Sequence, residues 1–460
     1  MGDIINQLYQ YIQELIQLYG NELKILCEFA VVLTAIFIGA KKGGLGLGIF
    51  GGLGLAVLVF VFKLQPKSPP IDVMLMIVAV ITAASTLQAS GGIDYMVRIA
   101  EKMLRAYPPA VTIVAPLVSY IFTFLAGTGH IAYALLPIIS EVATEAKVRP
   151  ERPLSISVIA SQQAITASPI SAATAALLSV IMIKNPEIGL AHILAIAIPS
   201  TLIGVLVAAI VQMFIGVDLE KDPVYLKRVE EGLMEIKKTH EVETGGTSTG
   251  AKLSVIIFLL SVASIVMFGS VQSLRPSWNG TPMEMPHVIE IIMLAAAGII
   301  IICTRTNVGK IASGSVFTAG MQAVIAIFGI AWMGDTFFGG NLEFFKGLLT
   351  DMVTDYPWTF AVALFLMSIM LFSQAATVRA LMPLGVSLGI PANSLIAMFP
   401  AVNGYFFIPN YPTIVAAINF DRTGTTRIGK YIVNHSFQIP GFIATIVAVS
   451  IGFALAYLIF

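Results

Sequence analysis

Apolar segments long enough to cross a lipid bilayer recur along the sequence from about residue 25 to the C-terminus. A hydrocarbon layer of roughly 30 Å needs about 20 apolar residues per crossing helix. Only 11% of the 460 residues are charged and 57% are hydrophobic, which gives a mean hydropathy of +0.89. Because soluble domains carry about 25% charged residues, the chain is predicted to be an all-α, polytopic membrane protein surrounded by the lipid bilayer.

The charge balance and the absence of catalytic motifs exclude several classes of function. The 26 basic residues equal the 26 acidic ones, so the composition predicts no nucleic-acid partner. Cys27 and Cys303 lie in apolar stretches without CxxC spacing, so neither a disulfide nor a metal site is expected. The sequence contains no GxxxxGK[ST], HExxH or GxSxG motif, so we expect no enzyme activity, no primary pumping and no cofactor.

The apolar pattern predicts ten crossing segments and two hairpins. Residues 1–24 form an amphipathic pattern that predicts a short helix in the membrane interface. Two apolar stretches, near 110–146 and 358–390, are interrupted by small and polar residues, and we interpret them as re-entrant hairpins. The ten crossing segments are predicted at about 25–40, 43–62, 71–90, 154–183, 192–216, 252–272, 286–304, 315–338, 394–420 and 431–460.

The distribution of Lys and Arg predicts the orientation. With the N-terminus outside, 19 of the 26 basic residues fall inside and Arg379 falls within a membrane segment. This asymmetry favours periplasmic N- and C-termini and a cytoplasmic linker at 217–251. The linker separates a first membrane repeat, 25–216, from a second, 252–460. The six basic residues left outside are Lys24, Lys63, Lys67, Lys184, Arg275 and Lys346.

The two repeats share a series of motifs in the same order. Gly91–Gly92 and Gly339–Gly340 each begin an amphipathic segment, which is basic in the first half and acidic in the second. LAGTGHIAYALLP aligns with LFSQAATVRALMP, and TASPIS around Pro169 aligns with IPNYPT around Pro409. The charge-derived topology places the two hairpins on opposite membrane faces, which predicts an inverted-topology repeat. Chance similarity between Gly-, Ala- and Pro-rich apolar segments is the alternative.

Four stretches combine a predicted helix break with neutral hydrogen-bonding side chains. A broken helix exposes unpaired backbone N–H groups and a partial positive charge, which can bind a carboxylate without a buried cation. The alternative is a set of kinked helices whose Ser and Thr hydroxyls bond to their own backbone. The candidate substrate-binding residues are Gly127, Thr128, Gly129, His130, Thr166, Ser168, Pro169, Ser171, Ser373, Gln374, Thr377, Arg379, Asn403, Asn410 and Thr413.

His130 and Arg379 have more than one interpretation. His130 is a candidate for protonation or carboxylate contact, or a residue that satisfies a hairpin turn. Arg379 is the one cation predicted inside a membrane segment, where ionisable residues are usually functional, so it is a candidate partner for a substrate carboxylate. Alternatively, it reaches the outer interface or pairs with an acidic neighbour.

Long strings in this sequence resemble the Dcu family of anaerobic C4-dicarboxylate transporters of the DcuA and DcuB type. The resemblance covers nearly the whole chain, and it implies antiport of fumarate, succinate, malate and aspartate in the inner membrane of an anaerobic bacterium. The family is similar to the wider ion transporter superfamily, which implies an elevator mechanism and a homodimer. The strings are KKGGLGLGIFGGLGL, DVMLMIVAVITAASTLQASGG, GTGHIAYALLPII, RPERPL, GIAWMGDTFFG, SQAA, NGYFFIPNYPT and FDRTGTTRIGKYIVNHSF.

Two alternatives to simple exchange remain open at the level of the sequence. One is a sodium- or proton-coupled importer of the same anions. The other is a transporter that also acts as a co-sensor with a signalling kinase as its partner. The linker of about 35 residues is shorter than a regulatory domain, which argues against sensing as the sole function.

Overall fold

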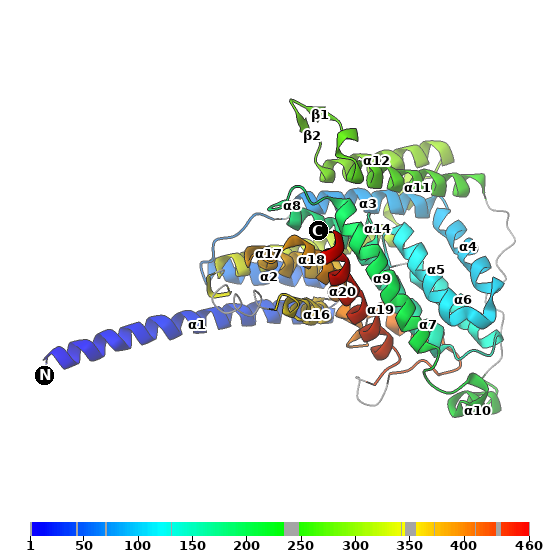
Figure 1. The fold of residues 1–460 in the computed structure, drawn as a ribbon, viewed down its shortest axis with the longest axis horizontal. Helices are drawn as coiled ribbons and strands as arrows, with labels where there is room; N and C mark the ends of the chain where they lie inside the picture. The colour runs from blue at the N-terminus through cyan, green and yellow to red at the C-terminus, as the bar shows by residue number, and fades with distance from the viewer. Residues whose placement is uncertain are drawn as a thin grey trace.

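The computed structural model is almost entirely helical (Figure 1). The one sheet in the described part of the chain is the antiparallel pair β1 (Ser277–Trp278) and β2 (Thr281–Pro282). The all-α, multi-pass class predicted from composition is therefore confirmed. The structure describes residues 2–42, 45–69, 71–129, 131–233, 248–341, 343–345, 356–371, 373–409, 411–428 and 434–459.

The elements follow the order expected for two halves and a linker. The first half consists of α1 (Gly2–Lys42), α2 (Gly46–Phe60), α3 (Ile71–Ala89), α4 (Gly92–Ala106), η1 (Pro108–Ala110), α5 (Val111–Ala126), α6 (Ile131–Glu145), α7 (Glu151–Ala167), α8 (Ala172–Met182) and α9 (Leu190–Gln212). The linker contains η2 (Leu219–Lys221) and α10 (Pro223–Glu230). The second half consists of α11 (Thr249–Ser270), η3 (Gln272–Leu274), α12 (Met285–Thr304), α13 (Val308–Ala312), α14 (Ser315–Gly340), α16 (Thr359–Leu371), α17 (Gln374–Ser387), α18 (Ala392–Met398), η4 (Phe399–Phe406), α19 (Pro412–Phe420) and α20 (Gln438–Ile459).

The described part of the chain has fewer long apolar helices than the ten crossing segments predicted. Seven helices are long and apolar enough to cross a membrane, or eight if the bent pair Met74–Ala89 and Gly92–Ala106 is one span. The segment predicted at 43–62 is helical over only 15 residues. The segment predicted at 394–420 is divided into α18, η4 and α19. Helix breaks, rather than polar loops, reduce the number, and hydropathy alone does not locate them.

The N-terminal residues do not form a separate helix. Instead, α1 continues without a break over Gly2–Lys42, so the predicted boundary at residue 24 is wrong at the level of the helix. In Figure 1 the N-terminal part of α1 extends away from the rest of the molecule. No Pro or Gly stands between residues 21 and 38, so the local sequence has no residue that would interrupt the helix there.

The two halves repeat the same packing partners. α1 packs on α2 in the first half, as α11 packs on α12 in the second. α5 packs on α7, as α16 packs on η4. Contacts between the halves also correspond, since α2 packs on α14 and α12 on α3, and α17 packs on α8 as α19 packs on α6. In Figure 1 α9 and α20, the last helices of each half, lie against each other at the centre.

Glycines allow α2 and α14 to approach closely. A Cβ atom on Gly329 of α14 would lie 1.9 Å from the carbonyl oxygen of Gly48 in α2, which no side chain could tolerate. Small residues at such positions let helix backbones come together in membranes. The Gly-rich string at 41–55 is thus explained by packing in this part of the protein.

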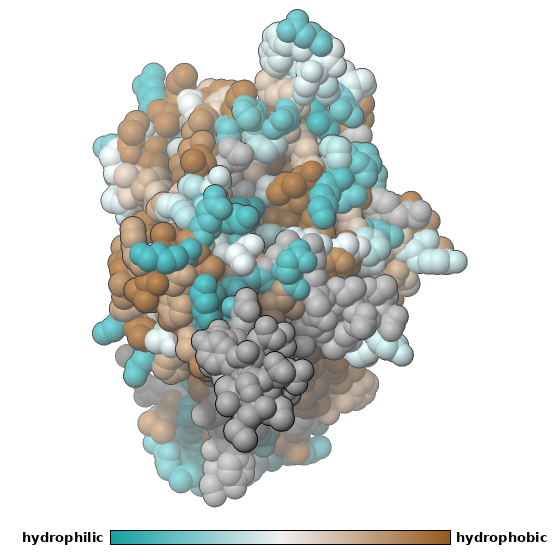
Figure 2. All heavy atoms as spheres, turned by 90° about the vertical axis from the view of Figure 1, so that its left-hand side faces the viewer, coloured by the Kyte–Doolittle hydropathy of each residue, from teal (hydrophilic) through white to brown (hydrophobic). Residues whose placement is uncertain are grey.

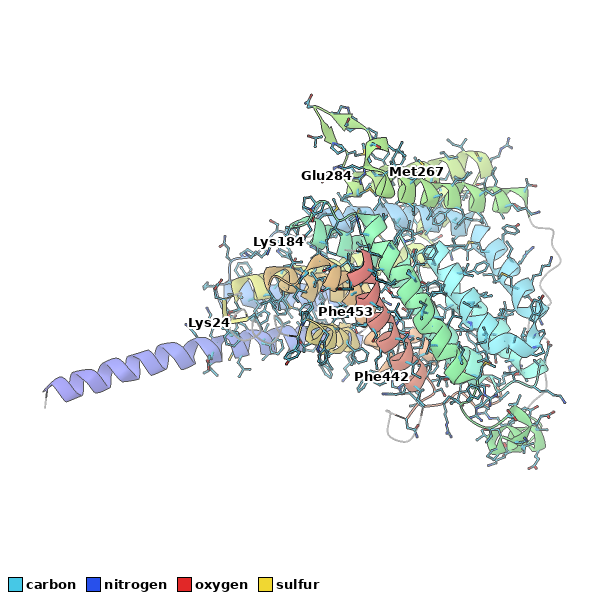
Figure 3. All side chains as sticks on the ribbon, in the orientation of Figure 1. Lys24, Lys184, Met267, Glu284, Phe442 and Phe453 are labelled. Atoms are coloured by element: carbon cyan, nitrogen blue, oxygen red, sulfur yellow. The ribbon has the colours of Figure 1, made fainter. Side chains whose placement is uncertain are left out.

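The surface has the apolar character that lipid contact requires. Ile302 is 78% exposed and Leu260 is 62% exposed, although both are large apolar side chains. Figure 2 shows broad apolar patches between groups of hydrophilic residues. In Figure 3 Met267 lies on α11, while Lys184 and Glu284 lie in the connections after α8 and before α12. Charged residues therefore gather at helix ends, as expected for a multi-pass membrane protein.

Candidate functional site

The first predicted break is a tight turn between α5 and α6. Gly127 has a φ of 68° and ends α5, and its backbone N–H donates to the carbonyl of Thr123 at 2.9 Å. This left-handed conformation favours glycine, because other residues pay a steric cost there. Thr128 and Gly129 follow in the turn, whereas His130 lies outside the described residues. The predicted hairpin is thus observed as two helices joined by a short turn.

The second break separates α7 from α8 and lies against the first. Pro169 and Ser168 occupy the non-helical connection, and the Ser168 hydroxyl donates to the carbonyl of Phe124 in α5 at 2.7 Å. Ser171 caps α8, since its Oγ accepts from the backbone N–H of Thr174 at 3.1 Å. The two breaks of the first half therefore hold each other in place.

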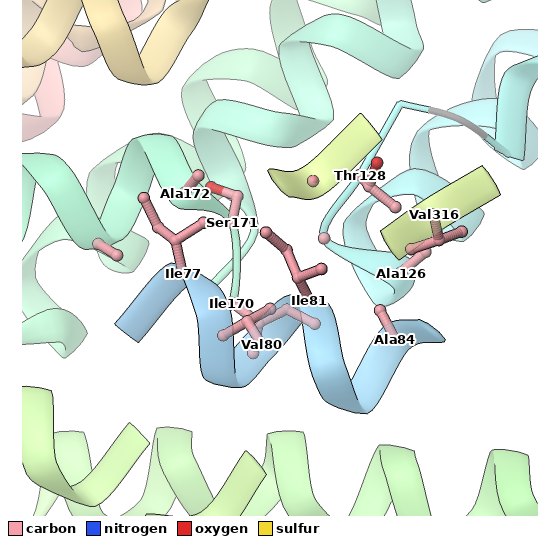
Figure 4. A pocket seen from close by; sticks show the side chains of 13 residues that line it. Ile77, Val80, Ile81, Ala84, Ala126, Thr128, Ile170, Ser171, Ala172 and Val316 are labelled. Carbon is pink, nitrogen blue, oxygen red and sulfur yellow. The ribbon is translucent and has the colours of Figure 1, made fainter. Parts of the chain in front are cut away.

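A cavity of about 120 Å³ lies between these two breaks and the helices α3 and α14 (Figure 4). Thr128 and Ser171 contribute hydroxyl groups to its wall. The first amide groups of α8 lie beside it, because Ala172 also lines the cavity. The rest of the wall is apolar, and it comes mainly from Ile77 and Ile81 of α3. The cavity thus combines a helix N-terminus with a dry apolar wall, an arrangement that suits a small anion.

The third and fourth breaks lie in the second half. Ser373 caps α17, and its Oγ accepts from the backbone N–H of Ala376 at 3.2 Å. In η4 the helix is interrupted at Asn403, which has a φ of −101° and a ψ of 30°. Thr413 lies in the first turn of α19, and its buried hydroxyl has no hydrogen-bond partner among the described residues. Asn410 lies outside the described residues.

Four buried amides, which we call the amide cluster, connect these breaks. They are Gln162, Gln163, Gln374 and Asn403, and none is more than 8% exposed. Gln374 Nε2 donates to Gln162 Oε1 at 2.7 Å and to Asn403 Oδ1 at 3.2 Å. Asn403 Nδ2 donates to Gln163 Oε1 at 3.2 Å. A Cβ on Gly129 would lie 2.9 Å from Gln162 Nε2, so the first turn also reaches the cluster.

The amide cluster follows the internal repeat. Gln163 stands six residues before Pro169, and Asn403 stands six residues before Pro409. These two equivalent residues hydrogen-bond to each other, so the symmetry of the sequence is realised as a direct contact. The cluster lies where the two halves meet, a position that binding sites of repeat-built transporters commonly occupy.

Sequence reasoning missed Gln162 and Gln163. Their signal is a pair of consecutive amides, SQQA, in the middle of the apolar segment predicted at 154–183. Polar residues at membrane depth are costly and therefore usually paired or functional. α7, which carries them, is buried on nearly all sides, so both side chains point into protein and not into lipid.

Several predicted donors are hydrogen-bonded to the backbone. The hydroxyl of Thr166 donates to the carbonyl of Gln163 at 2.8 Å, and that of Thr377 donates to the carbonyl of Ser373 at 2.8 Å. With Ser168, these residues have the bonding expected of the kinked-helix alternative. Thr128, Ser171, Gln374 and Asn403 are better placed to contact a ligand.

Arg379 lies away from the amide cluster, in a second cavity between α8, α14 and α17. Its Nη2 is 3.6 Å from Asp335 Oδ2, and its Nη1 is 3.4 Å from the Ser179 hydroxyl. The structure therefore pairs Arg379 with an acidic neighbour and separates it from the other candidates. In the described residues, no group of three His, Cys, Asp or Glu side chains could hold a metal ion.

Comparisons with known proteins place the chain among membrane transporters. The sequence profile of the family described as "Anaerobic c4-dicarboxylate membrane transporter" matches residues 24–460. The anaerobic C4-dicarboxylate transporter DcuB of Escherichia coli O6:H1 is 43% identical over 93% of this chain and 98% of its own length. DcuA of Escherichia coli K12 is 44% identical over 94% and 99%, and DcuA of Wolinella succinogenes is 42% identical over 93% and 98%.

Solved structures of transporters share the fold at low sequence identity. The Alcanivorax borkumensis YdaH transporter aligns with a TM-score of 0.54 and 14% identity, over 95% of this chain and 98% of that chain. Neisseria gonorrhoeae MtrF, described among a class of antimetabolite efflux pumps, aligns with a TM-score of 0.53 and 10% identity, over 87% and 84%. At such identities the likeness concerns the fold, whereas the sequence matches concern the family. The chain belongs to the family of anaerobic C4-dicarboxylate membrane transporters.

Proposed function

We propose that this protein exchanges C4-dicarboxylates such as fumarate, succinate, malate and aspartate across the inner membrane of a bacterium. The observation that carries the proposal is the meeting of three helix breaks at the amide cluster, beside a cavity that a helix N-terminus faces. The names of the relatives support the same substrate class.

Neutral groups suit the binding of a dianion that must also be released. In the proposed site, one carboxylate lies near Thr128 and the first turn of α8, and the other lies near the amide cluster. Amide and hydroxyl donors in a low-dielectric site bind a carboxylate strongly, and the partial charge of a helix N-terminus adds to this. Buried cations would bind more tightly and slow the exchange of substrate.

Substrate passage follows an elevator-type alternating-access mechanism in this proposal. The hairpins α5–α6 and α16–α17 act as re-entrant hairpins from opposite faces, and the broken helices α7–α8 and η4–α19 complete the moving unit. The repeated packing partners of the two halves support this arrangement. The moving unit needs a fixed partner, so we propose a homodimer formed through the other helices.

Counterflow in proteoliposomes tests the proposal. Vesicles loaded with unlabelled succinate should accumulate labelled succinate through the purified protein, and external fumarate, malate and aspartate should compete. If uptake instead requires a sodium or proton gradient and no internal dicarboxylate, the protein is a coupled importer. No uptake of any of the four anions would overturn the proposal. A co-sensor role with a signalling kinase would require an additional effect on kinase activity.

A pair of hydroxyl variants tests the site. Thr128→Ala removes a hydroxyl from the cavity wall, and loss of a donor to a charged oxygen costs about 1.5–3 kcal/mol, or about tenfold to hundredfold in affinity. Ser264→Ala is the matched control, because its exposed hydroxyl donates within α11 to the carbonyl of Leu260 at 2.8 Å. Equal half-saturation concentrations for both variants would show that the cavity is not the substrate site.

A further inference from the structure

The cavity around Arg379 differs in chemistry from the cavity at the helix breaks. Its volume is about 280 Å³, and its lining includes three charged side chains, Lys67, Asp335 and Arg379. None of its lining residues is shared with the cavity of Thr128 and Ser171. Two cations and one carboxylate leave a net positive charge in a crevice with apolar walls.

The ion pair in this cavity is loosely made. The distance of 3.6 Å between Arg379 Nη2 and Asp335 Oδ2 exceeds the roughly 2.7–2.9 Å of a good charge-assisted hydrogen bond. The other carboxylate oxygen of Asp335, Oδ1, is buried and has no hydrogen-bond partner among the described residues. A pair with such geometry recovers little of its desolvation cost and can be exchanged for a better one.

Lys67 is held in position by α14. Its backbone N–H donates to the Thr336 hydroxyl at 3.2 Å, and its carbonyl accepts from the indole N–H of Trp332. Its side chain crosses α14 at Gly339, where a Cβ would lie 2.4 Å from Lys67 Cε. Gly339 is four residues after Asp335, so both lie on the same face of the helix. The ammonium group is therefore placed by the fold on the side of α14 that carries Asp335.

We propose that this cavity is a second, outer binding site for small dicarboxylates. One substrate carboxylate would lie between Arg379 and Lys67, taking the place of Asp335 beside Arg379. Lys184, whose Nζ donates to the carbonyl of Val386 at 2.9 Å, adds positive charge nearby at the end of α17. The proposal rests on the proposed function. It assigns the cavity to the periplasmic side, where charge counting places Lys67 and Lys184. There the excess positive charge attracts dianions and raises their local concentration.

A matched pair of lysine variants tests the proposal. Lys67→Gln removes the cation that lines the cavity, whereas Lys63→Gln removes an equal charge four residues earlier, outside the lining. Succinate counterflow is measured in phosphatidylcholine vesicles, which carry no anionic headgroup that could occupy the site. Lys67→Gln should raise the half-saturation concentration about two- to fivefold, as expected for one solvent-accessible charge contact, with the maximal rate unchanged. Lys63→Gln should leave both values at the wild-type level.

Asp335→Asn gives an effect of opposite sign. Without the competing carboxylate, Arg379 should hold succinate more tightly, so the half-saturation concentration should fall. A purely structural pair would instead make Asp335→Asn lower the yield or raise the half-saturation concentration, which would overturn the proposal. Equal effects of Lys67→Gln and Lys63→Gln, or no effect of either, would also overturn it. If the wild-type protein shows no counterflow, the proposed function itself fails, which is a distinct result.

Discussion

The side chains of the amide cluster are buried where solvent cannot replace a lost hydrogen bond. Each amide has donors and an acceptor, and an unsatisfied buried group costs about 1–3 kcal/mol. Gln374 is the central member, because its Nε2 donates both to Gln162 and to Asn403. A single residue of α17 thus ties together two elements of different halves.

Replacing Gln374 by Ala should therefore weaken both stability and transport. The change leaves two buried acceptors without this donor, so the free energy of unfolding should fall by roughly 2–4 kcal/mol, taking each lost partner at about 1–2 kcal/mol. Thermal unfolding in detergent measures the stability, and counterflow per folded protein measures transport.

Gln212→Ala is the matched control for this variant. Gln212 is also buried, and its Nε2 donates to the Ser155 hydroxyl at 2.9 Å, but it lies at the end of α9, away from the breaks. We expect this variant to lose stability while its counterflow per folded molecule stays near the wild-type rate. If both variants lost transport equally, the amide cluster would have no special part in substrate binding.

The sequence predicted some residues of the candidate site well and others poorly. Gly127 and Ser373 were found because a helix break leaves Gly or a capping residue as a local signal. Gln162 and Gln163 were missed, because they lie inside the continuous helix α7 and only tertiary packing brings them to Asn403. The pairing of Arg379 with Asp335 likewise depends on how α14 packs on α17.

At the scale of elements, the turn between α5 and α6 is determined by backbone geometry. Gly127→Ala places a side chain at a φ of 68°, and the new Cβ would lie 2.7 Å from Ile170 Cγ1. A left-handed conformation costs a non-glycine residue roughly 1–2 kcal/mol, and the contact adds to it. We expect a lower thermal unfolding temperature and reduced counterflow, because the turn must move away from α8.

Gly52→Ala provides the comparison for Gly127→Ala. Gly52 lies in α2, and a Cβ there would have no heavy atom within 4 Å. Alanine favours the helix over glycine by about 1 kcal/mol, so this variant should be as stable as the wild type or more stable. A similar loss in both variants would mean that the sensitivity of Gly127 does not arise from the turn.

The connection after α9 contains a buried ion pair whose effect depends on pH. Asp222 accepts from the backbone N–H of Tyr225 at 3.1 Å and pairs with Arg149, which also contacts Glu151. Burial raises the pKa of the Asp222 carboxyl, but the N–H of Tyr225 and the Arg149 guanidinium lower it by more, so the net pKa lies below its usual value of 3.8. The resulting stabilisation is present above pH 3.8 and is lost as the pH falls through the lower folded-state pKa.

This sign leads to a specific expectation for Asp222→Asn. At neutral pH the variant should be less stable than the wild type by about 1.5–3 kcal/mol, because a hydrogen-bonded charge is lost. The difference should shrink as the pH falls below the usual carboxyl range, since the wild-type group then also becomes neutral. Unfolding in detergent between pH 3 and pH 7 measures it. Asp218→Asn is the control, because that side chain is 63% exposed. A difference that is constant with pH would contradict this account.

At the scale of the whole molecule, the orientation in the membrane is an expectation from charge, and two exposed elements can test it. The β1–β2 pair and α10 lie at opposite corners of the molecule in Figure 1. They are separated in the sequence by α11, whose 21 residues from Thr249 to Gly269 are long and apolar enough to cross a bilayer once. Lys221, Lys227 and Arg228 lie near α10, whereas Arg275 is the basic residue next to the β1–β2 pair. Because basic residues are retained on the cytoplasmic side, α10 should be cytoplasmic and the β1–β2 pair periplasmic.

Cysteine labelling can check this arrangement after Cys27 and Cys303 have been replaced by Ser. A single cysteine in place of Ser277, which is exposed in β1, should react with a membrane-impermeant maleimide added to intact cells. One in place of Glu230, which is exposed in α10, should react only after the cells are permeabilised. The reverse pattern would invert the topology and would place Lys67 and the Arg379 cavity on the cytoplasmic side. Labelling of both positions from outside would mean that α11 does not cross the membrane, and the inverted repeat would then lose its support from charge counting.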